Sequence, residues 1–209
     1  MTRPDIAHIV SHLSKYNNAF DRTHWKAVKR VFKYLKGTAD VVLSYERNGE
    51  IDIVGFCDAD YASDEDDRKS YSGYCFKIGN NLVSWSSCKQ TTVSLSTCEA
   101  EYVAITEASK EAIWLKSLLR EVLSGELKTE TTCIFSDNQA AICLANGEGS
   151  HKRAKHIDIK LHFVKDLVSE GKIKLKHIST ENMPADVLTK ALGPNKHKKC
   201  CKLLGLNIR

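Results

Sequence analysis

Apolar residues recur every three or four positions along the first 40 residues, which is the spacing of amphipathic helices. This pattern predicts helices over residues 4–17 and 21–37. The apolar face of the second helix is formed by Trp25, Val28, Phe32 and Leu35. Gly37 follows that face, and glycine commonly stands just past the end of a helix.

The pattern then changes to short runs of apolar and β-branched residues, which are typical of β-strands. These runs cover residues 41–45, 51–57, 72–78 and 82–88. Asn48-Gly49 predicts a hairpin between the first two runs, because this dipeptide favours tight turns. Asn80-Asn81 predicts a second turn, between the last two runs.

Helical and strand-like segments alternate in the second half of the chain. A long helix is predicted from about residue 97 to residue 123. It is followed by a strand at 132–136, helices at 138–145 and 157–168, a strand at 173–178, and a helix at 185–192 opened by Pro184. This order fits an α/β fold in which helices cover a mixed sheet.

The composition narrows the class of protein without identifying it. Of 209 residues, 42% are hydrophobic and 27% charged, which is ordinary for a globular domain. No run approaches the roughly 20 apolar residues that cross a bilayer, and the first residues lack the apolar segment of a signal peptide. The eight cysteines form no C-x-x-C pair, so we expect free thiols rather than zinc ligands. These features predict an intracellular protein without a membrane partner.

The net charge of +5 permits a polyanionic partner but does not require one. Acidic residues are more informative, because Asp58 and Asp137 each follow a predicted strand. Binding sites in open α/β sheets form beyond the carboxyl ends of strands, and paired carboxylates there can bind hard cations. Aspartate is also common in turns and helix caps, so either residue alone has a purely structural alternative.

The long helix allows a sharper distinction between two glutamates. Its sheet-facing stripe comprises Ala104, Ile105, Ala108, Ala112, Leu115, Leu119 and Val122. Stepping back along this stripe leads to Glu101, whereas Glu99 lies about 200° away around the helix and completes a capping box with Ser96. A carboxylate on a buried face is costly unless it is paired or binds a metal. Glu101 is therefore the stronger functional candidate.

Asp186 lies in the first turn of the last predicted helix. A favourable interaction with the helix dipole would be enough to explain an aspartate at this position.

Seven motifs together resemble the ribonuclease H of copia-type retrotransposons, and they appear in the order of that family. They cover residues 55–62, 68–76, 84–90, 95–102, 136–139, 152–159 and 185–190. Residues 2–37 resemble the end of the reverse transcriptase of the same family. The paired aspartates of the polymerase are absent, so polymerase activity is not expected from this chain.

The resemblance implies an RNase H-like fold: a five-stranded mixed sheet flanked by helices and preceded by a short helical segment. We accordingly divide the chain into the reverse transcriptase tail at 1–40, the ribonuclease H domain at 41–192 and a basic tail at 193–209. The resemblance also implies a catalytic and metal-binding cluster, formed by Asp58, Glu101, Asp137 and Asp186.

The implied reaction is hydrolysis of the RNA strand of an RNA–DNA hybrid during reverse transcription. Two Mg²⁺ ions, for which Mn²⁺ can substitute, would activate water and stabilise the departing 3′ oxygen. The implied partners are the hybrid and the reverse transcriptase portion of the same polyprotein. The implied location is a cytoplasmic virus-like particle or the nucleus.

The sequence leaves two alternative functions open, and it does not decide the roles of the basic run and of Asp60. The chain could be a catalytically silent nucleic-acid-binding remnant or structural module, or a protein-interaction domain. The basic residues Lys152, Arg153, Lys155 and His156 are predicted to contact the hybrid, although charge runs are usually solvated loops. Asp60 is interpreted as a solvated loop residue rather than as support for the cluster.

Overall fold

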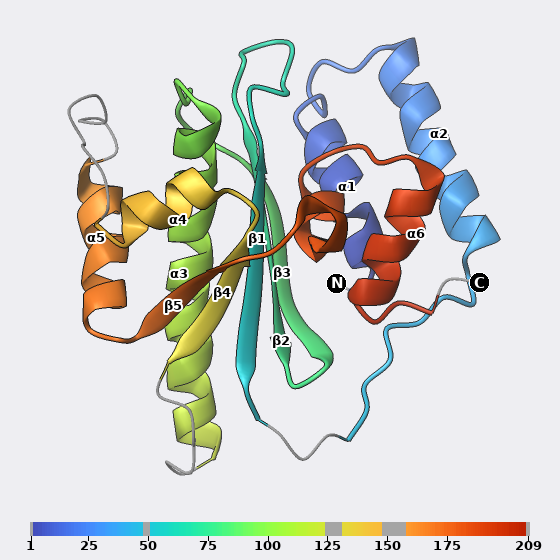
Figure 1. The fold of residues 1–209 in the computed structure, drawn as a ribbon. Helices are drawn as coiled ribbons and strands as arrows, with labels where there is room; N and C mark the ends of the chain where they lie inside the picture. Colours follow the sequence, from blue (N-terminus) through green and yellow to red (C-terminus); the bar gives the residue numbers. More distant parts are fainter. Residues whose placement is uncertain (1, 48–50, 124–130, 148–157, 208–209) are drawn as a thin grey trace.

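The computed structural model describes residues 2–47, 51–123, 131–147 and 158–207 (Figure 1). Within these ranges the strands form one five-stranded sheet in the order β3-β2-β1-β4-β5. The strands are β1 (Ile53–Asp60), β2 (Tyr71–Ile78), β3 (Asn81–Lys89), β4 (Thr132–Ser136) and β5 (Ile173–His177). The first three are antiparallel, whereas β4 is parallel to β1 and β5 to β4. The predicted mixed sheet is confirmed.

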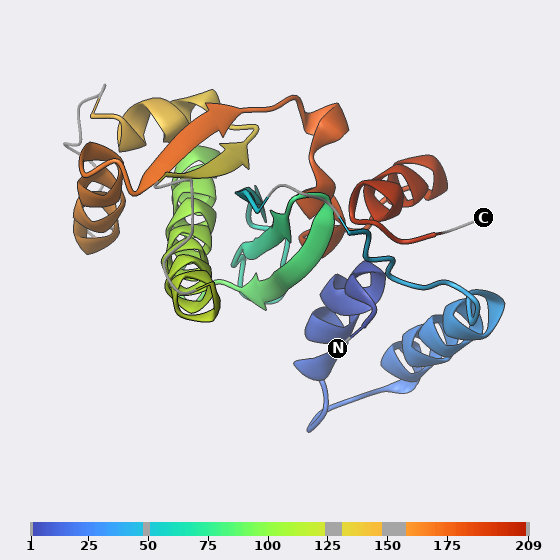
Figure 2. The same ribbon diagram turned by 90° about the horizontal axis from the view of Figure 1, so that it is seen from below.

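Helices cover both faces of the sheet (Figure 2). One face carries α3 (Thr97–Val122), α4 (Gln139–Ala145) and α5 (Asp158–Ser169), whose apolar side chains form the main core with the sheet. The other side carries η1 (Pro4–Ile6), α1 (Ala7–Ser14), α2 (Arg22–Gly37), η3 (Thr180–Asn182), η4 (Pro184–Leu188) and α6 (Pro194–Leu203). A second, smaller core lies between the sheet, η4 and α6.

Two local features bring α3 and η4 close to β1. The sheet-facing stripe of α3 contains alanines, and their small side chains let the helix backbone approach the sheet. Gly73 lies opposite Asp58 in the β1–β2 ladder. A Cβ at Gly73 would lie 2.7 Å from the Leu188 Cβ and 2.8 Å from the Thr189 Cγ2. The glycine therefore leaves the space in which the chain after η4 passes over the site.

Two predicted elements differ from the structure. Residues 41–45 do not form a strand: within this segment Leu43 makes an isolated antiparallel bridge with Leu206. Residues 41–45 do not pair with β1, because β2 and β4 occupy the two edges of β1, and the predicted turn at Asn48-Gly49 lies outside the described residues. The predicted helix at 185–192 is instead the short 3-10 helix η4, which ends where the Thr189 hydroxyl donates to the Asp58 carboxylate.

The segment expected to be a basic tail contributes to the smaller core. Pro194 begins α6, and Cys200, Cys201 and Leu204 are buried at its C-terminal end. All eight cysteines lie within the described ranges, and none of them forms a disulfide there. In the same ranges, no helix is long and apolar enough to cross a membrane.

Candidate functional site: a buried carboxylate cluster

Three aspartates from separate elements meet at one edge of the sheet. Asp58 lies in β1, Asp137 directly follows β4, and Asp186 lies in η4. β1 and β4 are parallel neighbours, so residues near their carboxyl ends lie side by side. One carboxylate oxygen from each aspartate lies within 4.8 Å of the others. Asp58 and Asp186 are each 1% exposed.

Glu101 lies near this cluster, in the second turn of α3. Glu101 and Glu99 are both 7% exposed, so burial alone does not separate them. The hydrogen bonds of the two carboxylates do distinguish them. The Glu99 carboxylate accepts a hydrogen bond from the Leu95 amide, whereas Glu101 Oε2 has no hydrogen-bond partner among the described residues. Half of the predicted capping box forms, because the Ser96 hydroxyl accepts from the Glu99 amide, whereas the Glu99 carboxylate accepts from the Leu95 amide instead of the Ser96 amide.

Burial and neighbouring carboxylates determine the electrostatics of this site. Burial, followed by the charges of Asp58 and Asp137, raises the pKa of Glu101 to about 9. Burial raises the pKa of Asp58 to about 6, against the opposing effect of the Lys190 ammonium. The cluster therefore resists carrying its full negative charge without additional cations.

Two lysines that the sequence analysis did not select contact the cluster. Lys190 Nζ lies 3.3 Å from Asp58 Oδ2 and 3.0 Å from Asp186 Oδ1. Lys196 Nζ lies 2.8 Å from Asp186 Oδ2. Lys190 was visible as the last residue of the 185–190 motif, but Lys196 lies in the segment expected to be a tail. Only the packing of α6 brings Lys196 to the site.

The hydroxyl groups of two threonines fix the orientation of the carboxylates. Thr180 Oγ1 donates to Asp137 Oδ2 at 2.6 Å, and the Thr189 hydroxyl donates to Asp58. The ligand atoms that lie within 4.8 Å of one another are all aspartate oxygens; Glu101 is not among them, but its buried Oε2 has no hydrogen-bond partner among the described residues. Hard divalent cations such as Mg²⁺ prefer such ligands, so Asp58, Glu101, Asp137 and Asp186 fit a Mg²⁺ site.

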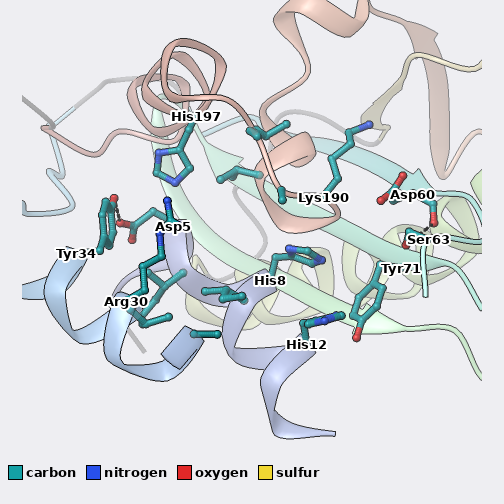
Figure 3. Close-up of a pocket in the computed structure, with 17 residues that line it drawn as sticks. Asp5, His8, His12, Arg30, Tyr34, Asp60, Ser63, Tyr71, Lys190 and His197 are labelled. Carbon is teal, nitrogen blue, oxygen red and sulfur yellow. Dashed lines mark hydrogen bonds between the residues drawn. The ribbon is translucent and has the colours of Figure 1, made fainter. Parts of the chain in front are cut away.

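Asp60 is not the solvated loop residue that the sequence suggested. It is the last residue of β1, and burial raises the pKa of its half-buried side chain. Asp60, Ser63 and Lys190 line one end of a cavity of about 700 Å³ between the N-terminal helices and η4 (Figure 3). The predicted basic contacts Lys152, Arg153, Lys155 and His156 lie outside the described residues.

Comparison with known proteins places this chain in a family. No protein-family model matches it. It is 41% identical over 206 residues to the retrovirus-related Pol polyprotein from transposon TNT 1-94 of Nicotiana tabacum, covering 99% of this chain. It is 38% identical over 191 residues to the corresponding polyprotein from transposon RE2 of Arabidopsis thaliana, covering 91% of this chain. The chain belongs to the copia-type retrotransposon Pol family. This Pol segment spans only 15% and 13% of those two polyproteins.

The fold agrees with solved ribonucleases. LC11-RNase H1, isolated from compost, matches this Pol segment with a TM-score of 0.51 and 17% identity. The match covers 66% of this chain and 93% of that structure. Together with the sheet order, this shows an RNase H-like fold.

Proposed function

We propose that this Pol segment is a ribonuclease H that hydrolyses the RNA strand of RNA–DNA hybrids with two Mg²⁺ ions. The observation that carries the proposal is the meeting of Asp58, Asp137 and Asp186 within 4.8 Å, with Glu101 buried beside them, on an RNase H-like sheet. The proposed partners are the hybrid and the reverse transcriptase portion of the polyprotein. The division at residues 40 and 192 and the intracellular location stay predictions.

The chain's own residues would prepare the site for phosphodiester hydrolysis. Bound Mg²⁺ would supply Lewis acidity and lower the pKa of a bound water molecule. The carboxylates of Asp58, Glu101, Asp137 and Asp186 would hold the ions. Thr180 and Thr189 already fix the orientation of Asp137 and Asp58 through hydroxyl hydrogen bonds, so little reorganisation is required there. RNA would be distinguished from DNA by its 2′-hydroxyl groups.

A cleavage assay with an end-labelled RNA strand tests the proposal. The full chain should cut the RNA in a hybrid when Mg²⁺ is present and stop when a chelator is added. It should leave the same RNA intact in an RNA duplex, and it should leave the DNA strand intact. Asp137→Asn should lose cleavage and keep hybrid binding. Hybrid binding without Mg²⁺-dependent cleavage by the wild-type chain would instead support the silent nucleic-acid-binding alternative.

A further inference from the structure

Lys190 and Lys196 together surround the Asp186 carboxylate. Lys190 Nζ lies 3.0 Å from Asp186 Oδ1, and Lys196 Nζ lies 2.8 Å from Asp186 Oδ2. Lys190 also reaches Asp58 Oδ2, at 3.3 Å. The lysine side chains are 29% and 28% exposed, whereas the two carboxylates are 1% exposed. Each oxygen of Asp186 thus lies within ion-pair distance of a partly exposed ammonium group, although Oδ1 accepts no hydrogen bond among the described residues.

These lysine contacts compensate part of the negative charge of the buried carboxylates. Carboxylates removed from water are costly unless cations compensate them. Three aspartates gather here with Glu101 nearby, and within the described ranges two ammonium groups form ion pairs with them. A divalent cation bound to Asp58 and Asp186 would compete for oxygens that the lysines already contact. Binding of such a cation therefore requires at least one ammonium to move.

We infer that Lys190 and Lys196 are built-in counter-cations, which stabilise the metal-free cluster and compete with Mg²⁺ for Asp58 and Asp186. This inference rests on the proposed function, because it takes the cluster as a Mg²⁺ site. The two lysines are positioning residues that act through the carboxylates. Their contacts set the Mg²⁺ concentration at which the site fills.

The two lysines differ in how easily they can move. Lys196 is anchored on α6, where its ammonium also donates to the Thr180 carbonyl. Lys190 lies after η4 on the rim of the cavity, and Asp60 lies on the same rim (Figure 3). The charge of Lys190 opposes the rise in the pKa of Asp60 that burial causes. In this proposal, Asp60 is the carboxylate towards which the Lys190 ammonium moves when a metal takes Asp58 and Asp186.

Mg²⁺ titration of the full chain by calorimetry, with thermal unfolding in chelator, tests this inference. Lys190→Met should bind Mg²⁺ roughly tenfold more tightly than wild type, because a nearby positive charge is removed. In chelator its Tm should fall by roughly 4 °C, because buried carboxylates lose their counter-charge. Lys196→Met should change both quantities in the same directions by less. Lys190→Arg keeps the charge and should bind Mg²⁺ nearly as wild type does.

Lys110→Met is the matched control, because Lys110 forms an exposed ion pair with Glu107 on α3. It should alter neither Mg²⁺ affinity nor Tm. If folded Lys190→Met and Lys196→Met bind Mg²⁺ no more tightly than wild type, the inference is wrong, although cleavage by the wild-type chain would still uphold the proposed function. If Lys190→Met does not fold, Lys196→Met decides. A wild-type chain that binds no Mg²⁺ would overturn both.

Discussion

Two buried aspartates in this protein, Asp64 and Asp58, are each held by lysines and yet differ in electrostatic state. The Asp64 side chain is fully buried, with Lys15 at 2.6 Å and Lys89 at 2.8 Å. Its hydrogen bonds to these two lysines hold its pKa well below the usual range, against the effect of burial. Asp58 is equally buried, but its pKa is raised to about 6 because burial and neighbouring carboxylates outweigh Lys190.

The two sites differ in how many buried carboxylates share the ammonium groups. At Asp64, the ammonium groups of Lys15 and Lys89 converge on one buried carboxylate, and they also pair with the exposed side chains of Asp66 and Asp67. This arrangement is complete and needs no further ligand. At Asp58, carboxylates outnumber the ammonium groups, so the cluster retains unmet negative charge. A structural ion-pair network and a candidate metal site are thus distinguished by counting charges around each buried oxygen.

The largest expected effect is the loss of cleavage in Asp58→Asn. The neutral amide keeps the shape and can still accept from Thr189, but it binds Mg²⁺ poorly. Turnover on the hybrid should fall by roughly a thousandfold. Circular dichroism and Tm in chelator should stay close to wild type. Cleavage at the wild-type rate would show that Asp58, like Asp64, has only a structural role.

Asp64→Asn should show the opposite profile. Removing the charge leaves Lys15 and Lys89 without their shared partner, and the free energy of unfolding should fall by about 2 kcal/mol. Thermal unfolding should report this as a Tm lower by roughly 4–8 °C. Turnover at 20 °C, where the chain stays folded, should remain within about threefold of wild type. A large loss of turnover without loss of Tm would remove the distinction between the two sites.

Glu101→Gln and Glu99→Gln separate two neighbouring glutamates of equal exposure. Glu101→Gln should reduce turnover by roughly a hundredfold and, in chelator at pH 7, raise stability by on the order of 2 kcal/mol. The gain is expected because Gln resembles the protonated acid that the raised pKa favours. Glu99→Gln should leave turnover and stability nearly unchanged, because an amide oxygen can also accept from the Leu95 amide. Equal losses of turnover in both variants would contradict the helix-face argument.

The dependence of stability on pH should have opposite signs at the two sites. A raised carboxyl pKa stabilises the fold only below its ordinary value, so the contribution of Glu101 is lost as the pH rises from 4.5 towards about 9. The lowered pKa of Asp64 stabilises the fold above 3.8, and that contribution is lost as the pH falls below this value. In chelator, Glu101→Gln should flatten the decline in Tm between pH 5 and 9, and Asp64→Asn should not. If Glu101→Gln leaves the slope of Tm against pH unchanged, the assignment of this pH dependence to Glu101 is contradicted.

Hydrophobic periodicity predicted most of the strands, because a strand or a buried helix face has a local sequence pattern. The resemblance to the family predicted the four acidic residues of the candidate site. The range 132–136 was predicted as the strand β4, and the sheet-facing stripe of α3 selected Glu101. Thr189 lies within the 185–190 motif, but its hydrogen bond to Asp58 does not follow from that motif, and Lys196 left no local signal. Their roles depend on contacts made after η4 and α6 pack beside β1, and a sequence pattern does not encode those distances.

The same reasoning explains the errors. Residues 41–45 have the composition of a strand, but β1 has no free edge, so Leu43 pairs with Leu206 instead. Asp60 was interpreted as a loop residue because strand ends are imprecise in sequence patterns. β1 continues through Asp60 and carries it to the cavity rim beside Lys190.

The smallest expected effect concerns a third group of cations, the basic run at residues 151–156, which lies outside the described residues. Unlike Lys190 and Lys196, these residues are predicted to meet charge on the substrate rather than on the protein. Lys152→Ala with Lys155→Ala should weaken hybrid affinity, most clearly at low salt, because each lost phosphate contact removes a released counterion. The log–log salt slope should flatten by roughly 0.7–0.9 per contact. Turnover at saturating hybrid and Mg²⁺ affinity should stay unchanged, which separates this effect from that of Lys190→Met. Fluorescence anisotropy with a labelled hybrid across a salt series provides the measurement, and Lys110→Met is the control. An unchanged affinity and slope would show that the run is a solvated surface segment.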